Sequence, residues 1–503
     1  MGEKIKKYLG GQNFFRLILI VFCIQALWFA VSIKGTVPPD EHYHFGLIQL
    51  YASEPITAGP FITHQPASSL WMGDVQRTPS VLYHYLMSFP LRLIDVFTHN
   101  VDIQLLAMRI VDIALSVCSL LAIRAIFKKL TPNAIISNLG IALFSLTGMF
   151  LWISSAVSYD NMATLAWLGF LWGLLCFQEE PSAKNLLKCL FFGISAALVK
   201  FDFVLVVAGT LVVYLAVNYN TLGNNTAKLV ASIKKLPSEI VRNRVATAFA
   251  ILTLMVAFMF IYRIGSNLVE YHAITPGCTS LHTSSECEQA SSYQRTVDVN
   301  NAVREFKDRG GWRSLNFSMI GFLGSWVDQM YQRMYYYFGY ITVTADPVSG
   351  IIFLLAIAFM IYLLAAKRGK AFDNKKQWLM LFVTLLFVAG LFYSNLNTYL
   401  STGTQIGYQG RYLLPVLPFV YVFIASLGYK VIQQTRGKRR TILLTSAAVL
   451  VLGFWYETFP GLVFMKASNQ SWYTPQTTSF NLHLKSVMTK THLFHPFVLR
   501  TNR

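Results

Sequence analysis

The chain has 503 residues, of which 54% are hydrophobic, 15% aromatic and only 13% charged. Soluble globular proteins carry about 25% charged residues, so this composition excludes a water-soluble enzyme of this size. The net charge of +19 comes from 42 basic against 23 acidic residues, and the basic residues lie in short segments between apolar runs. A nucleic-acid-binding protein would gather them on one soluble surface, so the pattern indicates membrane topology and no nucleic-acid partner.

Apolar runs of membrane-spanning length recur along the whole chain. The first, 17–33, follows the basic N-terminus MGEKIKK, and no small-residue cleavage site comes after it. We therefore expect a retained helix with its N-terminus in the cytoplasm. Ten more runs predict an all-α polytopic membrane protein with about eleven transmembrane helices. They are 105–127, 134–153, 161–178, 185–200, 202–218, 245–264, 347–366, 377–397, 412–430 and 441–458.

Alternate crossing of these spans places the short basic connections on the N-terminal side, as expected for cytoplasmic loops. Two segments decide the parity. Segment 80–97 is apolar, but it follows Pro79 and contains Pro90, His84 and Arg92, so we expect a re-entrant or interfacial helix within an outer loop. Block 186–217 is interrupted by Lys200-Phe201-Asp202, which predicts two short helices that meet at an outer turn.

The hydrophilic segments then fall on the outer face, where we expect the chemistry. We predict one transmembrane domain, 1–458, whose outer loops form an active-site cap, followed by an outer C-terminal tail, 459–503. The cap loops are 34–104, 265–346 and 398–411. We see neither an internal repeat nor a low-complexity linker.

Cys278 and Cys287 are nine residues apart in the outer loop 265–346, which predicts a disulfide in an oxidising compartment. The other four cysteines lie in apolar spans, where a free thiol behaves as a small hydrophobe. Spacings typical of a zinc site do not occur in the sequence.

The segment Pro38-Pro39-Asp40-Glu41-His42-Tyr43-His44 follows the first span directly. The prolines favour a helix start, with the carboxylates in its first turn and Asp40 and His44 on one face. An ionised Asp40 there would accept a hydrogen bond from a hydroxyl or bind a metal ion. The alternative is an ordinary acidic N-terminal capping turn.

A second carboxylate, Asp160, stands in a tight outer turn between two apolar runs. A charge so near the bilayer is expensive and often functional, but the Asp-Asn pair also suits a turn and helix cap.

The third signal is Gln409-Gly410-Arg411-Tyr412-Leu413-Leu414-Pro415 at the outer mouth of a span. A guanidinium at a membrane interface, supported by Gln409, is suited to hold a phosphate or pyrophosphate at lipid-headgroup depth. The alternative is a snorkelling anchor arginine. Lys200 could supply a second phosphate contact or pair with its neighbour Asp202.

The outer loop 265–346 ends in an aromatic segment, from Trp326 to Tyr340, that contains Arg333. We assign most of these rings to a membrane-interface belt, with sugar stacking as the alternative. Arg333 is a candidate for a further contact with an anionic lipid.

These motifs resemble the GT-C class of integral-membrane glycosyltransferases, which use polyprenyl-phosphate-linked sugars. Pro39-Asp40-Glu41 with His44 is similar to the acidic first-loop motif of that class. The segment from Gln409 to Pro415 resembles the QGRY-x-x-P signature of an uncharacterised bacterial membrane-protein family. The topological resemblance covers the whole chain.

The resemblance implies a GT-C-like fold in which Asp40, with Glu41 beside it and Asp160 as a second outer carboxylate, carries the catalysis. His44, Lys200, Arg333, Gln409, Arg411 and Tyr412 would bind the substrate. No cofactor is certain from the sequence, and a divalent cation bound at the site is possible under this resemblance. The chain lacks a large C-terminal soluble domain and a WWDYG-type sequence, which disfavours an oligosaccharyltransferase.

The sequence therefore predicts transfer of a sugar from a polyprenyl-phosphate donor to a glycan or lipid acceptor of the cell envelope. Asp40 would take the acceptor proton and Arg411 would stabilise the departing lipid phosphate. The resemblance places the protein in a bacterial plasma (inner) membrane, although outer sequons at Asn316 and Asn469 would also suit a eukaryote.

Two other classes stay open. A transporter or flippase for a lipid-linked or anionic solute would also use many spans and interfacial cations, but its ionisable groups should lie near the bilayer midplane. A structural assembly subunit would tolerate replacement of Asp40 and Arg411.

Overall fold

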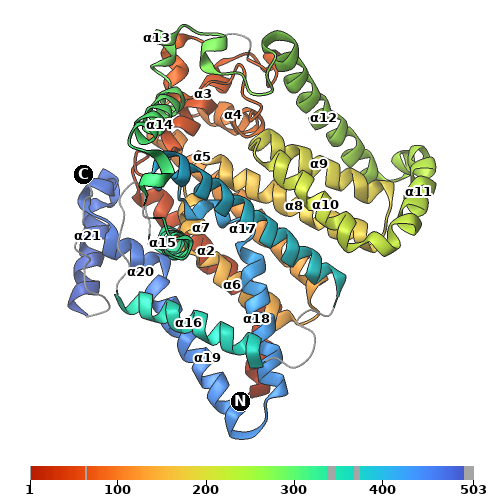
Figure 1. Ribbon diagram of the computed structural model, residues 1–503, viewed down its shortest axis with the longest axis vertical. Helices are drawn as coiled ribbons and strands as arrows, with labels where there is room; N and C mark the ends of the chain where they lie inside the picture. Colours follow the sequence, from red (N-terminus) through yellow and green to blue (C-terminus); the bar gives the residue numbers. More distant parts are fainter. Residues whose placement is uncertain (1, 63–64, 316, 337–346, 367–373, 492–503) are drawn as a thin grey trace.

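The protein is a bundle of apolar helices covered at one end by a cap of short helices and loops (Figure 1). The computed structural model describes residues 2–62, 65–315, 317–336, 347–366 and 374–491. Within these ranges the regular structure is helical, apart from one isolated β-bridge between Ile33 and Tyr473. The fold is therefore that of an all-α polytopic membrane protein.

Among the described residues, six helical stretches are long and apolar enough to cross a membrane. They are α2 (Gln12–Ser32), α5 (Val101–Leu130), α8 (Tyr159–Glu179), α12 (Arg244–Tyr271), α17 (Lys375–Thr402), and α19 (Gly437–Thr458) taken together with α20 (Pro460–Ala467). Two bent pairs raise the number to eight if each pair counts as one span. These are α6 (Ala134–Ser145) with α7 (Gly148–Ser154), and α10 (Phe203–Val217) with η3 (Tyr219–Thr221) and α11 (Leu222–Arg242).

Helices also occupy the other expected spans, but they are shorter. They are α9 (Ala183–Val199), α16 (Pro347–Ala366) and α18 (Leu417–Gln434). At 1.5 Å per residue, the 17 residues of α9 extend roughly 26 Å, less than the ~30 Å of a hydrocarbon core. Length and composition thus support six to eight spans, whereas eleven stays a prediction.

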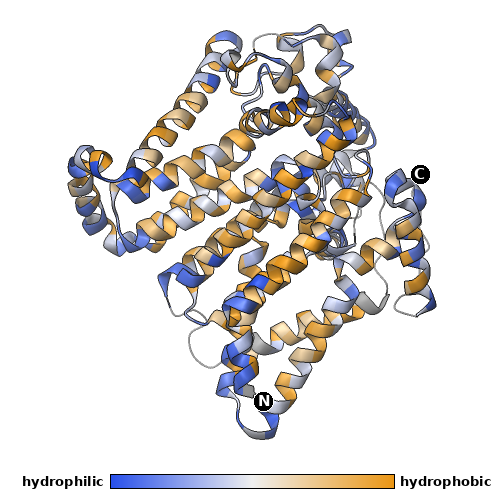
Figure 2. Cartoon of the chain, turned by 180° about the vertical axis from the view of Figure 1, so that it is seen from behind, coloured by the Kyte–Doolittle hydropathy of each residue, from blue (hydrophilic) through white to orange (hydrophobic). Residues whose placement is uncertain are grey.

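The cap and the periphery contain the remaining helices. The cap consists of α3 (Glu41–Ser53), η1 (Ile56–Ala58), η2 (Ala67–Met72), α4 (Leu82–Asp95), η4 (Cys278–Ser280), α13 (Ser284–Cys287), α14 (Ser291–Asp308), η5 (Gly311–Ser314), α15 (Met319–Tyr335) and η6 (Gly410–Leu413). At the periphery lie α1 (Gly2–Leu9), η7 (Gln470–Trp472) and α21 (Pro475–Lys490). Figure 2 shows the apolar residues along the middle of the long helices and the hydrophilic ones gathered at their ends.

Contacts between connections confirm that the bundle has two distinct ends. At the end opposite the cap, Lys129 and Lys376 both pair with Glu179. The Asn138 amide donates to the carbonyl of Leu9 at 2.8 Å, which places the N-terminal segment at this end too. These are the basic connections that the sequence assigns to one side. Their cytoplasmic orientation remains a prediction.

The two segments that decide the parity fold as expected. α4 is only 14 residues long and stays within the cap, because Arg92 near its end donates to the cap carbonyls of Tyr51 and Glu54. α9 and α10 are separate helices joined by the turn 200–202, where the amide of Phe201 donates to Ser80 at 3.0 Å. The turn therefore lies at the cap end.

The C-terminal segment packs on the first long helix. Its Tyr473 bridges to Ile33, and the amide of Thr474 donates to the carbonyl of Ser32 at 2.9 Å. Asn481 of α21 accepts a 3.1 Å hydrogen bond from the indole of Trp28. The described part of the predicted outer tail, 459–491, therefore forms α20, η7 and α21, and it is held against α2.

Candidate functional site

Four charged side chains from distant parts of the sequence meet at the cap end of the bundle. Asp40 precedes α3, Asp160 lies in the first turn of α8, Lys200 joins α9 to α10, and Arg411 belongs to η6. All four are predicted site residues, but nothing in their positions along the sequence indicates that they touch.

The four groups form a chain of alternating charge. Arg411 donates from one terminal nitrogen to Asp40 Oδ2 at 2.7 Å, and its Nε lies 3.7 Å from Asp160 Oδ2. Lys200 Nζ donates to Asp160 Oδ1 at 2.9 Å. Lys200 thus pairs with Asp160 across 40 residues and not with the neighbouring Asp202, which was one of the two alternatives that the sequence left open.

Asp40 is the most exposed member of this chain, and the other three side chains are largely buried. The side chain of Asp40 is 36% exposed, whereas those of Arg411, Asp160 and Lys200 are 6%, 10% and 15% exposed. Burial alone would lower the pKa values of Arg411 and Lys200, but Asp160 raises both above their ordinary values. The site therefore keeps two buried cations charged behind one accessible carboxylate.

The backbone at Asp40 explains why its carboxylate reaches Arg411. Asp40 has a left-handed conformation, with φ of 62°, and its side chain makes no capping hydrogen bond to α3. The backbone carbonyl still accepts from the amide of His44 at 3.0 Å. The ordinary capping turn is therefore ruled out for Asp40. Strain of this kind costs of order 1–3 kcal/mol and persists where surrounding contacts fix it.

Asp160 is likewise not the cap of its helix. Ser158 caps α8 by accepting from the amide of Asp160 at 3.3 Å. Asn161, the other half of the predicted Asp-Asn turn, turns inward and donates to the carboxylate of Asp112 at 3.0 Å. The carboxylate of Asp160 therefore interacts with Lys200 and Arg411 and does not cap the helix.

Glu41 occupies a different environment from Asp40. It is fully buried and accepts two hydrogen bonds from Arg109, at 2.8 and 2.6 Å, and one from the amide of Val157 at 2.8 Å. Arg109 also donates to the carbonyls of Ala30 and Ile33 at the end of α2. This ion pair ties the segment before Asp40 to the segment before Asp160.

The glycine of the Gln409–Pro415 segment sets how closely η6 approaches α15. A Cβ on Gly410 would lie 2.7 Å from backbone atoms of Arg333, so a larger residue would push the two elements apart. Within η6, the carbonyl of Gln409 accepts from the amide of Tyr412 at 3.1 Å. The ring of Tyr412 lies 4.7 Å from Lys200 Nζ, in cation–π contact. Arg333, Gln409 and Tyr412 therefore flank the charged chain.

The described aromatic residues of α15 are interior residues. Trp326, Tyr331 and Tyr335 are buried, and the indole of Trp326 donates to Asn395 at 3.0 Å. The predicted interface belt is therefore wrong for these rings, because α17, α18 and their neighbours cover them. Residues 337–340 of the predicted segment, like Asn316, lie outside the described residues.

His44 forms a buried pair with His84 next to the charged chain. His44 Nδ1 and His84 Nε2 are 3.0 Å apart, and the ring of His44 meets that of Tyr159 edge-on at 4.5 Å. Burial lowers the pKa of His44 to about 3 and also lowers that of His84, so both rings are neutral and one of them donates its N–H to the other. His44 Nε2 has no hydrogen-bond partner among the described residues.

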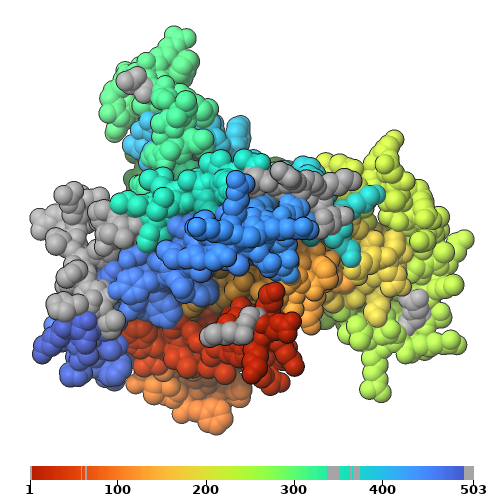
Figure 3. Space-filling model, turned by 90° about the horizontal axis from the view of Figure 1, so that it is seen from below, coloured from red at the N-terminus to blue at the C-terminus, as the bar shows by residue number. Residues whose placement is uncertain are grey.

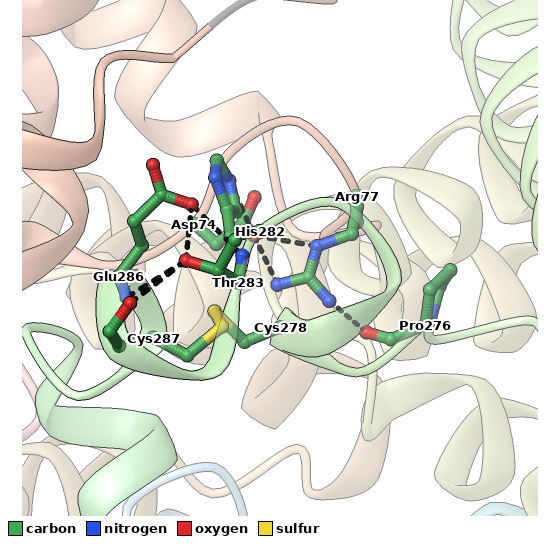
Figure 4. Close-up of a disulfide and its surroundings, with 9 residues drawn as sticks. Asp74, Arg77, Pro276, Cys278, His282, Thr283, Glu286 and Cys287 are labelled. Atoms are coloured by element: carbon green, nitrogen blue, oxygen red, sulfur yellow. Dashed lines mark hydrogen bonds and ion pairs between the residues drawn. A yellow bond between two sulfur atoms is a disulfide. The ribbon is translucent and has the colours of Figure 1, made fainter.

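The predicted disulfide is present and fastens the cap. Cys278 and Cys287 are bonded, and Arg77 links the neighbouring loop to them by donating to Asp74 and to the carbonyl of Pro276 (Figure 4). The contacts of Arg77 thereby join the first cap loop, 34–104, to the second, 265–346.

The donor set does not suit a resident metal ion. Within the part of the chain that the structure describes, no three His, Cys, Asp or Glu side chains gather as a metal site. Asp40 and Asp160 both face the guanidinium of Arg411, which a divalent cation would have to displace.

A family model described as "Predicted membrane protein (DUF2142)" matches residues 76–420, more than half of the chain. The chain belongs to the DUF2142 family of predicted membrane proteins. The matched region of this DUF2142 protein contains Asp160, Lys200 and Arg411, and begins after Asp40. No curated protein matches it.

Among solved structures, this DUF2142 chain is similar to the archaeal oligosaccharyltransferase AglB from Archaeoglobus fulgidus, in complex with an inhibitory peptide and a dolichol-phosphate. The identity is 10% and the TM-score 0.45, over 97% of this chain and 60% of that chain. The chain thus spans about three fifths of AglB. Similarity of this degree assigns no activity.

Proposed function

We propose that this protein is a glycosyltransferase that moves a sugar from a polyprenyl-phosphate donor to a glycan or lipid hydroxyl at the outer face of the membrane. The observation that carries the proposal is the chain Asp40–Arg411–Asp160–Lys200, which sets one accessible carboxylate beside two buried cations. A base and an anion-binding group within one hydrogen bond of each other meet the needs of transfer from a phosphate leaving group.

The two cations suit the phosphate of the donor. Arg411 Nε and Asp160 Oδ2 are both buried, lie 3.7 Å apart and have no hydrogen-bond partner among the described residues. A guanidinium with an unused N–H can donate a hydrogen bond to a phosphate oxygen without first losing all its protein contacts. Lys200, held by Asp160, supplies a second positive charge on the same side.

Asp40 would act as the base after an exchange of ion-pair partners. In the described state its carboxylate is bound to Arg411. A donor phosphate that takes over Arg411 would free Asp40 to accept the proton of the acceptor hydroxyl. The hydroxyl oxygen then bonds to the anomeric carbon as the bond from that carbon to the phosphate oxygen breaks. The electron pair leaves with the lipid phosphate, whose added negative charge Arg411 and Lys200 stabilise.

The remaining predicted residues receive supporting roles. Asp160 would keep Lys200 and Arg411 charged and in place, and Glu41 would position Asp40 through Arg109. His44, whose free Nε2 lies beside Tyr159, would bind a sugar hydroxyl. Tyr412, Gln409 and Arg333 at the junction of η6 and α15 would contact the donor.

Binding of a polyprenyl phosphate to the purified protein tests the phosphate site. Arg411→Ala should weaken binding at least tenfold, whereas Asp40→Asn should bind as tightly as wild type or more tightly, because Arg411 loses a competing partner. Arg313→Ala and Asp202→Asn are matched controls, since both residues are exposed at the same end.

Equal binding by Arg411→Ala and Arg313→Ala would overturn the phosphate site. Binding without any sugar transfer, combined with movement of the lipid between leaflets of a vesicle, would instead identify a transporter or flippase. Full activity of both site variants would leave only a structural role for the charged chain.

A further inference from the structure

The connection between α10 and α12 is an amphipathic helix that lies across the end of the bundle. α11 and its preceding turn bend 70° away from α10, and Figure 1 shows α11 beyond the ends of α9, α10 and α12. The amide of Ala183 donates to Ser232 of α11 at 2.9 Å, which fixes the helix at the end opposite the cap.

One side of α11 packs on the protein and an adjacent apolar strip does not. Leu229, Leu236 and Ile240 are half-buried against neighbouring helices. At 100° per residue, Val230 and Ile233 fall beside this packed side, yet they are 47% and 46% exposed. The yellow-green region that contains α11 forms one edge of the molecule in Figure 3.

The remaining arc of α11 is basic. Lys228, Lys234, Lys235 and Arg242 are all exposed, against one acidic residue, Glu239, in the sequence of the helix. An exposed apolar strip bordered by basic residues is the arrangement of helices that lie in the headgroup layer of a membrane.

We propose that α11 is an interfacial helix that binds the headgroups of anionic phospholipids in the leaflet at the N-terminal end. Its apolar strip would enter the acyl boundary, and its lysines and Arg242 would contact lipid phosphates. The inference does not depend on the proposed glycosyl transfer.

Continuity with the spans favours a lipid over a protein partner. α10 and α12 on either side of α11 have strongly exposed apolar residues, such as Leu205 at 80% and Leu254 at 71%. α12 is a candidate span, and α10 is an apolar helix of 15 residues from which α11 bends away by 70°. The exposed apolar surfaces of both helices would face lipid, so α11 between them would lie at the bilayer surface. Net positive charge complements an anionic leaflet there.

Local lipid quenching of a fluorophore tests the proposal in the full-length protein. The four free cysteines are replaced, the disulfide is kept, and a polarity-sensitive label is attached at Ile233→Cys. Val449→Cys, 63% exposed on α19, serves as a lipid-facing control away from α11. Vesicles contain equal fractions of phosphatidylcholine and phosphatidylglycerol, with a quenching group on one or the other.

The label at 233 should be quenched at least about twofold more by the anionic lipid than by the neutral one, whereas the label at 449 should show a ratio near one. Changing Lys228, Lys234, Lys235 and Arg242 together to Gln should remove the preference. Changing the three lysines to Arg should preserve it, which separates lost charge from lost structure.

Quenching of the label at 233 by aqueous iodide but by neither lipid would overturn the proposal and point to a protein partner for the strip. An equal response to both lipids, or a preference that survives the Gln changes, would overturn the anionic-lipid assignment.

Discussion

Loss of either partner of the Glu41–Arg109 ion pair should be the most destabilising single change near the site. Their side chains are 0% and 3% exposed, so removal of one leaves the other charged and buried. Removing one partner of a buried pair typically costs about 3–5 kcal/mol in the free energy of unfolding. The destabilisation by Arg109→Met should lie at the upper end of this range, because the carbonyls of Ala30 and Ile33 also lose their hydrogen-bond donor.

The double variant distinguishes an ion pair from two independent contacts. In Glu41→Gln the side-chain oxygen can still accept from the amide of Val157, so this change removes mainly the charge. With Arg109→Met also present, no uncompensated charge remains, and we expect at least about 2 kcal/mol of the combined loss to be recovered.

Equilibrium unfolding of the purified protein in mixed micelles, for wild type, both single variants and the double variant, gives the coupling free energy directly. Strictly additive losses would refute the reasoning. So would a loss under about 1 kcal/mol for Arg109→Met, since surface ion pairs already reach that value.

Three further outcomes follow from the structure. Gly410→Ala should destabilise the cap by about 1–3 kcal/mol in thermal unfolding, because its Cβ would lie 2.7 Å from the α15 backbone. Stability should fall with acidification below about pH 6.5, where His44 and His84 would bind protons only in the unfolded state. Burial holds the folded-state pKa of His44 near 3, so each histidine contributes up to ~1.4 kcal/mol per pH unit, and His44→Gln should flatten the slope. Replacing Cys278 and Cys287 with Ser should cost roughly 2–3 kcal/mol and speed proteolysis of the cap, and unchanged proteolysis would contradict the role given to the disulfide.

The features that the sequence predicts best are those set by local pattern and compartment. The disulfide follows from two cysteines in one outer loop, and the turn at Lys200 follows from a charged break in an apolar block. Basic residues in the short connections predict that these connections lie on one side, and Lys129 and Lys376 do meet at one end of the bundle, where both pair with Glu179. These are short-range signals that need no knowledge of packing.

The contacts of the site could not be predicted, because they join residues far apart in the chain. Asp40 and Arg411 are separated by 371 positions, and each alone suits a cap or an anchor. Only packing of α3, α8 and η6 brings them together. The left-handed backbone conformation of Asp40 could not be predicted either, because a positive φ is uncommon for residues other than glycine.

Arg109 was missed although the sequence contained a signal. It lies, with Asp112, inside an otherwise apolar run, and ionisable residues within spans are usually paired. Arg109 and Asp112 are 2% and 0% exposed, which agrees with that rule. Length and composition support six to eight spans and eleven stays a prediction, because apolar runs of 15 to 18 residues such as α10 and α18 are as compatible with short or bent helices as with full crossings.

Release of free polyprenyl phosphate from a polyprenyl-phosphate sugar, followed by mass spectrometry, tests the central claim most directly. The purified protein is supplied with lipid and glycan acceptors from a cell envelope. Wild type should release the lipid phosphate as the sugar appears on an acceptor. Asp40→Asn should retain donor binding and lose at least about 100-fold in rate. Release at the same rate by Asp40→Asn, or no release by wild type that binds the donor, would contradict the account.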